Sequence, residues 1–338
     1  MAYEQRNTLV INAIKVDRSI VACSRIARFL REKFGYAVLD SSSVSLQRGR
    51  YDNIILINSP WGFCDASHRE RVGDLVAGAR RVVWVQNDYN GGIGPRSLKQ
   101  LSHEWLNKGR PLAVWTTVPH FLEKWKGNEK IPLDAKRSAY VNWNALHYQP
   151  RRAAPPSMAN LQTRTRAILY YGAFRPGRAE KFETYFGRKS KFNLVVSTSK
   201  VYGAKAFRPL LGSRPGHTEL IDPLPDPIAA LSTYAATVYL EDEFAREHYV
   251  SPAGRFYEAL AARTVQLVDA DAGSTLLRAG LTVPEKWIVR SAADVGRWLG
   301  AARSSADVYN EAVEQLNVWA RVDPRKVFGN QLRKAMSL

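Results

Sequence analysis

The sequence predicts an α/β protein built from two doubly wound parallel sheets. At 338 residues the chain is long enough for two domains of ordinary size. Short apolar runs alternate with helix-like segments in both halves, which is typical of Rossmann-like domains. A proline-rich stretch at 150–156 interrupts this alternation and predicts the domain boundary. We therefore expect an N-terminal domain at 1–155, a C-terminal domain at 156–305 and a terminal segment at 306–338.

The first half predicts a sheet whose strands are separated by helices. Its apolar runs have the length of buried strands, and the segments between them carry apolar residues at helical spacing. The expected strands are 8–14, 37–39, 53–58, 81–86 and 113–117, and the expected helices are 19–34 and 69–77. No Gly-x-Gly-x-x-Gly follows the first strand, so nothing in this half indicates a dinucleotide site.

A glycine-rich loop at 87–95 follows the expected strand at 81–86. Loops at the carboxyl ends of parallel strands face the ligand crevice, and glycines permit close approach of a substrate. Asp88 stands in this loop, where it could act as a general base toward an acceptor hydroxyl. The alternative is a turn residue whose carboxylate caps its own loop. Asp88 is the candidate catalytic residue.

The second half begins with a strand at 167–171 and a basic loop that contains glycine. Gly172, Arg175 and Arg178 lie in this loop, and Lys181 follows at the start of a helix. A strand, a glycine loop with cations and a helix N-terminus form an arrangement suited to phosphates. These four residues are candidates for phosphate binding. The alternative is that the cations only solvate the loop.

The most informative motif lies at residues 249–269. Ser251 is a good N-cap and Pro252 a good first helical residue, and Arg255 and Glu258 lie three apart in the helix that follows. The helix N-terminus and Arg255 would attract a phosphate, and Glu258 could accept hydrogen bonds from a ribose. Ser251, Arg255 and Glu258 therefore indicate a nucleotide-diphosphate site. The alternative is an ordinary capped helix with an Arg–Glu pair on its surface.

The remaining segments continue the alternation of strands and helices. The expected strands are 193–197, 217–221, 237–240, 264–268 and 287–289, and the expected helices are 228–234, 272–279, 292–302, 308–319 and a basic one near 324–338. Three acidic residues at 241–243 fit the solvated start of a helix better than a metal site, because they lack an Asp-x-Asp context. We expect no required metal.

The net charge of +18 is the strongest signal in the composition. Residues 1–155 contribute +11 and the remainder +7, so the excess lies in both halves and in no single tail. Such a field attracts polyanions, of which double-stranded DNA is the favoured partner. An anionic lipid surface, an acidic glycan and nucleotide donors are alternatives.

Several features bear on where the protein works. No apolar run is long enough for a membrane span, and the polar N-terminus shows no signal peptide. Cys23 and Cys64 are the two cysteines, and their spacing indicates neither zinc nor redox chemistry. We expect a cytoplasmic protein, in the host cell if a phage encodes it.

The stretch Ser-x-x-x-Arg-Phe-x-Glu-Ala-Leu-Ala at 251–261 resembles the donor-binding helix of glycosyltransferases with the GT-B fold. That resemblance implies two Rossmann-like domains that face each other across a cleft. It also implies that Gly172 and Arg175, with Arg178 or Lys181, face the donor diphosphate, and that a C-terminal helix packs back on the first domain. The expected co-substrate is a nucleotide-sugar, with UDP-sugar the favoured donor, and no cofactor is required.

In size, fold and basicity the chain resembles phage enzymes that glycosylate hydroxymethylated pyrimidines in DNA. A buried base must be flipped out to reach such a site, and Trp61, Tyr89 or Trp143 could stack on it, unless these aromatics simply pack in the core. Many retaining GT-B enzymes have a Glu-x7-Glu pair, but Val250 stands eight residues before Glu258. The stereochemical course is therefore open. The alternatives are transfer to a cell-surface glycan, lipid or protein, and a non-catalytic nucleic-acid-binding protein.

Overall fold

The structure is a computed structural model of the whole chain. Its described residues are 7–12, 21–40, 51–57, 66–86, 111–125, 133–147, 164–172, 178–198, 203–301, 304–319 and 330–332. The chain forms two compact units, which are described separately: Met1–Leu146 together with Arg325–Leu338, and His147–Pro324. The proline-rich stretch at 150–156, where the sequence places the boundary, lies outside the described residues.

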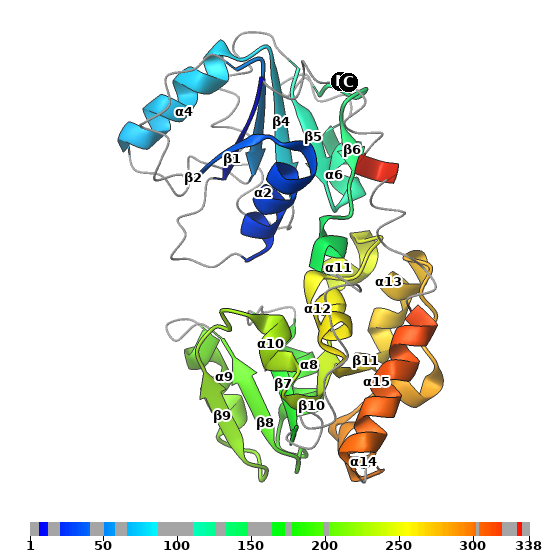
Figure 1. The fold of residues 1–338 in the computed structure, drawn as a ribbon. Helices are drawn as coiled ribbons and strands as arrows, with labels where there is room; N and C mark the ends of the chain where they lie inside the picture. The colour runs from blue at the N-terminus through cyan, green and yellow to red at the C-terminus, as the bar shows by residue number, and fades with distance from the viewer. Residues whose placement is uncertain are drawn as a thin grey trace. The chain divides into compact units, whose positions relative to one another are not determined.

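The first unit contains a six-stranded parallel sheet in the order β2-β1-β3-β4-β5-β6 (Figure 1). Its strands are β1 (Thr8–Asn12), β2 (Ala37–Asp40), β3 (Asn53–Ile57), β4 (Arg81–Gln86), β5 (Ala113–Thr116) and β6 (Ala139–Tyr140). The helices between them are α2 (Val21–Phe34), α4 (Ala66–Gly78), α6 (Pro119–Trp125) and the 3-10 helix η3 (Trp143–His147). Each expected strand of this half is present.

The central strands of the first unit are covered by its hydrophobic core. β1 and β3 are buried on both faces because their apolar residues are consecutive, as parallel strands covered by helices require. Trp143 belongs to this core, 2 % exposed, with its ring 6.2 Å from that of Trp115. Trp143 is therefore a packing residue and no candidate for stacking on a base. Trp61 and Tyr89 lie outside the described residues.

Residues from the end of the chain complete the first unit. Leu332 is 2 % exposed in the same core as Trp143. The Asn142 N–H donates to Gln331 Oε1 over 3.1 Å. A segment nearly two hundred residues away in sequence thus packs on the first unit, while the helix at Ser305–Trp319 belongs to the second.

The second unit contains another six-stranded parallel sheet, in the order β12-β11-β10-β7-β8-β9 (Figure 1). Its strands are β7 (Thr165–Tyr171), β8 (Leu194–Ser197), β9 (Thr218–Ile221), β10 (Tyr234–Tyr239), β11 (Val265–Asp269) and β12 (Ile288–Val289). β7 comes first in sequence yet lies between β8 and β10, so the strand order reverses there. The carboxyl ends of strands at such a point are where doubly wound sheets bind ligands.

Helices cover both faces of the second sheet. They are α8 (Ala179–Phe186), α9 (Gly203–Leu211), α10 (Pro227–Leu231), α11 (Glu243–His248), α12 (Gly254–Ala262), α13 (Gly273–Arg278), α14 (Ala292–Ala301) and α15 (Ser305–Trp319), with short 3-10 helices η5 (Ala270–Ala272) and η6 (Glu285–Trp287). Side chains alternate across β7: Ile168 and Tyr170 pack with α8 and α9, whereas Leu169 packs with α10 and α12. This alternation buries the sheet on both sides.

α15 joins the second sheet through two side-chain amides. The Gln266 N–H donates to Gln315 Oε1 over 2.9 Å, and Gln315 Nε2 donates to the Gln266 carbonyl over 2.8 Å. Both residues are buried, so Gln315 satisfies backbone groups that no strand of the described chain covers. Although the sequence assigns this helix to a separate terminal segment, these bonds tie it to β11.

The predicted fold class is confirmed. Two parallel six-stranded sheets with flanking helices follow each other along the chain. No described helix is long and apolar enough to cross a membrane.

Candidate nucleotide-diphosphate site

The second sheet positions the candidate site at the carboxyl ends of β7 and β10. Gly172 directly follows β7, and Tyr239 is the last residue of β10. The guanidinium carbon of Arg255, in the first turn of α12, lies 5.3 Å from the centroid of the Tyr239 ring. Two strand ends and a helix N-terminus therefore meet around Arg255.

The N-terminus of α12 differs from the sequence prediction. The sequence places the first helical residue at Pro252 and the cap at Ser251, whereas α12 begins at Gly254 and Ala253 is its N-cap. Ala253 has an extended backbone, φ −63° and ψ 159°, and its N–H donates to the Tyr239 hydroxyl over 2.8 Å. This bond to the neighbouring strand holds the chain extended for two residues more than the local sequence indicates.

The C-terminus of α12 is held by a buried arginine. Arg164 is 6 % exposed, and its Nη1 donates to the Arg263 carbonyl over 2.8 Å. Arg263 takes the left-handed conformation, φ 54°, that ends many helices. Burial lowers the pKa of Arg164, with the Arg263 charge acting in the same direction. Because both ends of α12 are bonded to other elements, the position of Arg255 is well defined.

Arg255 carries hydrogen-bond donors that the described residues leave unused. Its Nε and Nη2 atoms are buried and have no partner among those residues. Burial opposes the charge, but Tyr170, Tyr239 and Glu241 outweigh it and raise the pKa of Arg255. A buried guanidinium without acceptors is costly, and an anion bound beside it would remove that cost.

Gly172 lets Arg255 approach β7. Its φ of +142° lies in the region that favours glycine. A Cβ at this position would lie 3.3 Å from Arg255 Nη1 and 3.5 Å from the Tyr170 hydroxyl. Two physical reasons thus favour glycine at position 172. They are its backbone conformation and the space that the Arg255 guanidinium occupies.

We expect Gly172→Ala to cost roughly 1–3 kcal/mol of folding free energy and to weaken binding of a nucleotide diphosphate, because the methyl group strains the backbone and crowds Arg255. Urea unfolding and titration with UDP measure the two effects. Gly296→Ala is the matched control, since a Cβ at Gly296 meets nothing within 4 Å. Equal stability and UDP affinity in the two variants would contradict the assigned role of Gly172.

Glu258 is buried on the second turn of α12. It is 5 % exposed, and its Oε2 accepts a hydrogen bond from the Tyr171 hydroxyl over 2.7 Å. That hydroxyl also lies 3.3 Å from the Arg255 carbonyl oxygen. The alternative of an Arg–Glu pair on the surface is therefore wrong, because Glu258 is directed to the end of β7.

Two hydroxyl groups near α12 also have no partner among the residues that the structure describes. Ser251 is 1 % exposed and its Oγ has no hydrogen-bond partner within the described ranges. The same holds for the Tyr170 hydroxyl, which belongs to a residue 1 % exposed at the end of β7. Buried hydroxyls normally find partners, so a polar ligand would complete both.

The acidic residues 241–243 start a helix as expected, but they are not all solvated. Glu241 is 1 % exposed and Asp242 8 %. Asp242 is the N-cap of α11, where its carboxylate accepts from the Ala245 N–H over 2.9 Å. Glu241 Oε1 lies 2.5 Å from the Tyr239 hydroxyl. Local sequence carries no signal for Glu241 and Tyr239, since only the fold shows that they are buried beside Arg255.

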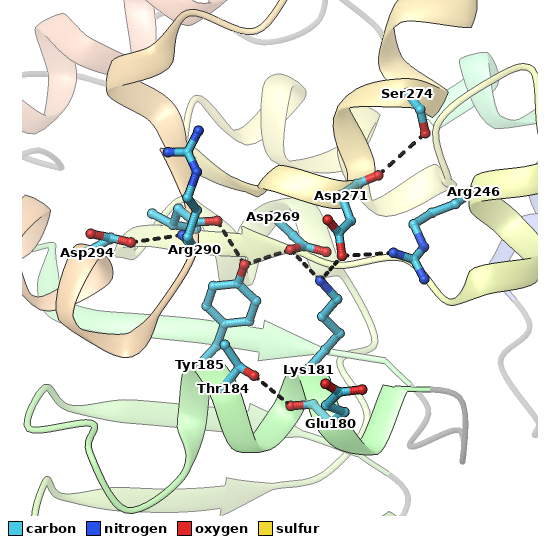
Figure 2. A network of polar contacts seen from close by, with 11 residues as sticks. Glu180, Lys181, Thr184, Tyr185, Arg246, Asp269, Asp271, Ser274, Arg290 and Asp294 are labelled. Atoms are coloured by element: carbon cyan, nitrogen blue, oxygen red, sulfur yellow. Dashed lines mark hydrogen bonds and ion pairs between the residues drawn. The ribbon is translucent and has the colours of Figure 1, made fainter.

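Two of the expected phosphate ligands are already paired with carboxylates. Arg178 is 6 % exposed, and its Nη2 lies 3.1 Å from Asp242 Oδ2. Lys181 bridges Asp269 at the end of β11, 2.9 Å away, and Asp271 in η5. Figure 2 shows Lys181 extending from α8 to these two carboxylates. These pairs connect Arg178 and α8 to the start of α11, the end of β11 and η5.

The network around Lys181 includes groups from α8, α11, the 3-10 helix η5 and the end of β11 (Figure 2). Arg246 Nη1 lies 2.9 Å from Asp271 Oδ2, and the Tyr185 hydroxyl lies 2.6 Å from Asp269 Oδ1. The hydrogen bond from Lys181 is the main reason that the pKa of Asp271 is lowered. Burial opposes the Lys181 charge, but Asp271 and Asp269 outweigh it and raise its pKa. The network is balanced in charge and has a structural role.

Two expected site residues cannot be placed. Asp88 and Arg175 lie outside the described residues. Within the described part of the chain there is no group of three or more His, Cys, Asp or Glu side chains arranged to hold a metal ion. Cys23 is buried, and Cys64 lies in an undescribed range.

Sequence comparison provides no family. No protein-family model matches the chain, and no curated protein matches it significantly. Comparison of structures does find similar folds. Phage T4 β-glucosyltransferase in complex with UDP-glucose aligns with a TM-score of 0.67 at 13% identity, over 98% of this chain and 99% of that one. The same enzyme with UDP and Mn²⁺ gives 0.68 over the same shares, also at 13% identity.

A third structure is similar over the same extent. It is an α-glucosyltransferase in complex with UDP-glucose and DNA containing an abasic site, with a TM-score of 0.58 and 11% identity over 98% of this chain and 99% of that chain. The fold is GT-B. The resemblance indicated by the motif at 251–261 is thereby confirmed for the fold, since sequence identity this low carries the architecture but not the chemistry.

Proposed function

We propose that this GT-B protein is a glycosyltransferase that uses a UDP-sugar. The observation that carries the proposal is the buried guanidinium of Arg255 at the strand-order reversal of the second sheet, with Nε and Nη2 that find no partner in the described part of the chain. Diphosphates bind at helix N-termini that carry such cations. The structural neighbours bound to UDP or UDP-glucose support this donor.

The donor would contact the residues that converge on Arg255. We assign the diphosphate to Arg255, Ser251 and the backbone at Gly172, with Arg175 from the same loop, and the ribose to Glu258. Arg178 and Lys181 remain in the donor set with a smaller role, because their charges are balanced by Asp242, Asp269 and Asp271. Fixed cations and N–H groups stabilise the negative charge that develops on the leaving UDP.

The acceptor we propose is the hydroxyl of a hydroxymethylated pyrimidine in double-stranded DNA. The net charge of +18 and the similarity to a glucosyltransferase bound to DNA support it. In the transfer, the acceptor hydroxyl loses its proton to Asp88 while its oxygen bonds to the anomeric carbon of the sugar. The bond between that carbon and the diphosphate oxygen breaks, and UDP leaves. Such a reaction places the enzyme in the cytoplasm that holds the DNA.

A measurement of UDP release separates this proposal from its competitors. We expect release from UDP-glucose to rise when hydroxymethylated duplex is added and to stay low with unmodified duplex. Release that ignores both DNAs would favour a glycan, lipid or protein acceptor. DNA binding without any binding of UDP or UDP-sugars would indicate a non-catalytic protein and would contradict the proposal.

We expect the transfer to continue in EDTA, because Arg255 and the helix N-terminus can stabilise the leaving diphosphate without a metal ion. One structural neighbour binds UDP together with Mn²⁺, so the effect of this metal on turnover is worth measuring. The measurement is turnover in EDTA with and without added excess Mn²⁺. Complete loss in EDTA that Mn²⁺ restores would show that a metal is required.

A further inference from the structure

We propose that Glu241 takes up a proton when the donor diphosphate binds beside Arg255, and that the protonated carboxyl then donates a hydrogen bond to the donor. The inference rests on the proposed UDP-sugar site and assigns that site a further positioning residue. It makes donor affinity depend on pH through one named side chain.

The hydrogen bonds around Glu241 fix the role of one of its oxygens. The Tyr239 hydroxyl accepts from the Ala253 N–H, 2.8 Å away, so it uses its own proton to donate to Glu241 Oε1. Ala253 is the N-cap of α12, directly before the first turn that carries Arg255. Through Tyr239, Glu241 therefore helps to set the position of the helix N-terminus.

The other oxygen of Glu241 has no such partner. Oε2 belongs to a residue only 1 % exposed and accepts no hydrogen bond from any described residue. The Thr275 hydroxyl lies near enough to the carboxyl to lower its pKa, but it donates to the Ala245 carbonyl over 3.5 Å. A buried carboxylate oxygen without a donor is costly, and the cost falls if the oxygen carries a proton or meets a ligand. With a proton on Oε2, the group becomes a hydrogen-bond donor that suits a phosphate oxygen.

The charges around Glu241 explain why binding of the sugar donor would cause Glu241 to take up a proton. Without donor, its carboxylate faces Arg255 on α12 and Arg178 before α8, along with the neutral Tyr239 and Thr275. Arg178 is already paired with Asp242, so among the described cations around Glu241 it is Arg255 that balances the carboxylate. A diphosphate beside Arg255 adds two negative charges and turns the carboxylate into a like-charged neighbour. Proton uptake from solvent relieves that repulsion.

The direction of the pH effect follows from the same groups. Burial raises the pKa of Glu241 even though Thr275, Tyr239, Arg255 and Arg178 act to lower it. Below this raised pKa the carboxyl is already neutral, and the affinity for donor does not change with pH. Above it, each binding event must first recruit a proton. Affinity therefore falls as pH rises, by at most about tenfold per pH unit for a single proton.

The test is calorimetric titration of the protein with UDP-glucose from about pH 5 to about pH 9, a range that brackets a raised carboxyl pKa. UDP-glucose is the probe because its two phosphates stay fully ionised across this range. We expect a wild-type affinity that is flat at low pH and falls at high pH. Titrations in two buffers of different protonation enthalpy should show net proton uptake in the falling region.

Glu241→Gln reproduces the protonated side chain. Its amide oxygen accepts the hydrogen bond from Tyr239, and its amide N–H takes the place of the proposed O–H of the protonated carboxyl. We expect this variant to bind without the pH slope and more tightly than wild type at high pH. Glu243→Gln is the matched control, since Glu243 is an exposed carboxylate two residues away, and it should keep the slope.

A wild-type affinity that is flat across the range, or a slope that persists in Glu241→Gln, would overturn the proposal. If Glu241→Gln fails to fold, the titrations of wild type in two buffers test the proposal instead. Zero proton uptake at every pH would contradict the proposal. Failure of the proposed UDP-sugar site would give a different result. UDP-glucose would then not bind, or its affinity would be the same in Arg255→Ala as in wild type.

Discussion

Replacing Arg255 with alanine is expected to weaken UDP-glucose binding about thirtyfold to hundredfold, roughly 2–3 kcal/mol, while the protein stays folded. Two buried N–H-bearing atoms of Arg255, Nε and Nη2, have no acceptor among the described residues, so a bound anion would receive charge-assisted hydrogen bonds from them. Titration calorimetry measures the affinity, and thermal unfolding with and without UDP-glucose shows whether the fold persists.

Two further variants show whether the effect of Arg255→Ala is specific to this guanidinium. Arg188→Ala removes an exposed arginine after α8 and should leave donor affinity unchanged, which controls for the loss of one positive charge. Arg255→Lys keeps the charge but loses the planar set of donors, and we expect an affinity between wild type and alanine. If Arg255→Ala binds UDP-glucose as well as Arg188→Ala does, the donor site is elsewhere.

Replacing Asp88 with alanine is expected to lower turnover about a hundredfold to ten-thousandfold and to leave donor affinity intact. The reason is that a general base acts on the acceptor hydroxyl and makes no contact with the donor diphosphate. The measurement is single-turnover transfer to hydroxymethylated DNA beside calorimetric titration with UDP-glucose.

Asp74→Ala, which removes an exposed carboxylate from α4 in the same unit, is the matched control and should transfer at the wild-type rate. Asp88→Asn should be as slow as Asp88→Ala, because the amide cannot accept the proton. Normal turnover in either Asp88 variant would reduce Asp88 to the turn residue that its glycine-rich loop also permits.

The fold could be predicted from the sequence because its signal is local. The centres of β1, β3 and β7 are runs of consecutive apolar residues, which few structures other than a covered parallel sheet explain. The position of Arg255 and Glu258 in one helix followed from their spacing. The start of that helix did not, because the bond from Ala253 to Tyr239 belongs to tertiary structure.

The remaining parts of the site depend on pairs that are distant in sequence. Lys181 was expected to bind phosphate, but Asp269 lies 88 residues further along the chain and no local pattern shows that the two meet. Glu241 stands among acidic neighbours that favour a solvated helix start, and only the sheet order places it beside Arg255 and away from water. Burial of a polar side chain is a property of the fold.

The central claim, sugar transfer from a nucleotide to DNA, is tested most directly by mass spectrometry of nucleosides. Duplex DNA containing hydroxymethylated pyrimidines is incubated with the protein and a panel of nucleotide-sugars, digested and analysed. We predict a modified nucleoside heavier by one sugar residue with a UDP-sugar, formed by wild type and strongly reduced in Arg255→Ala. Unchanged nucleosides with every donor, in a protein that binds both DNA and UDP-glucose, would contradict the account.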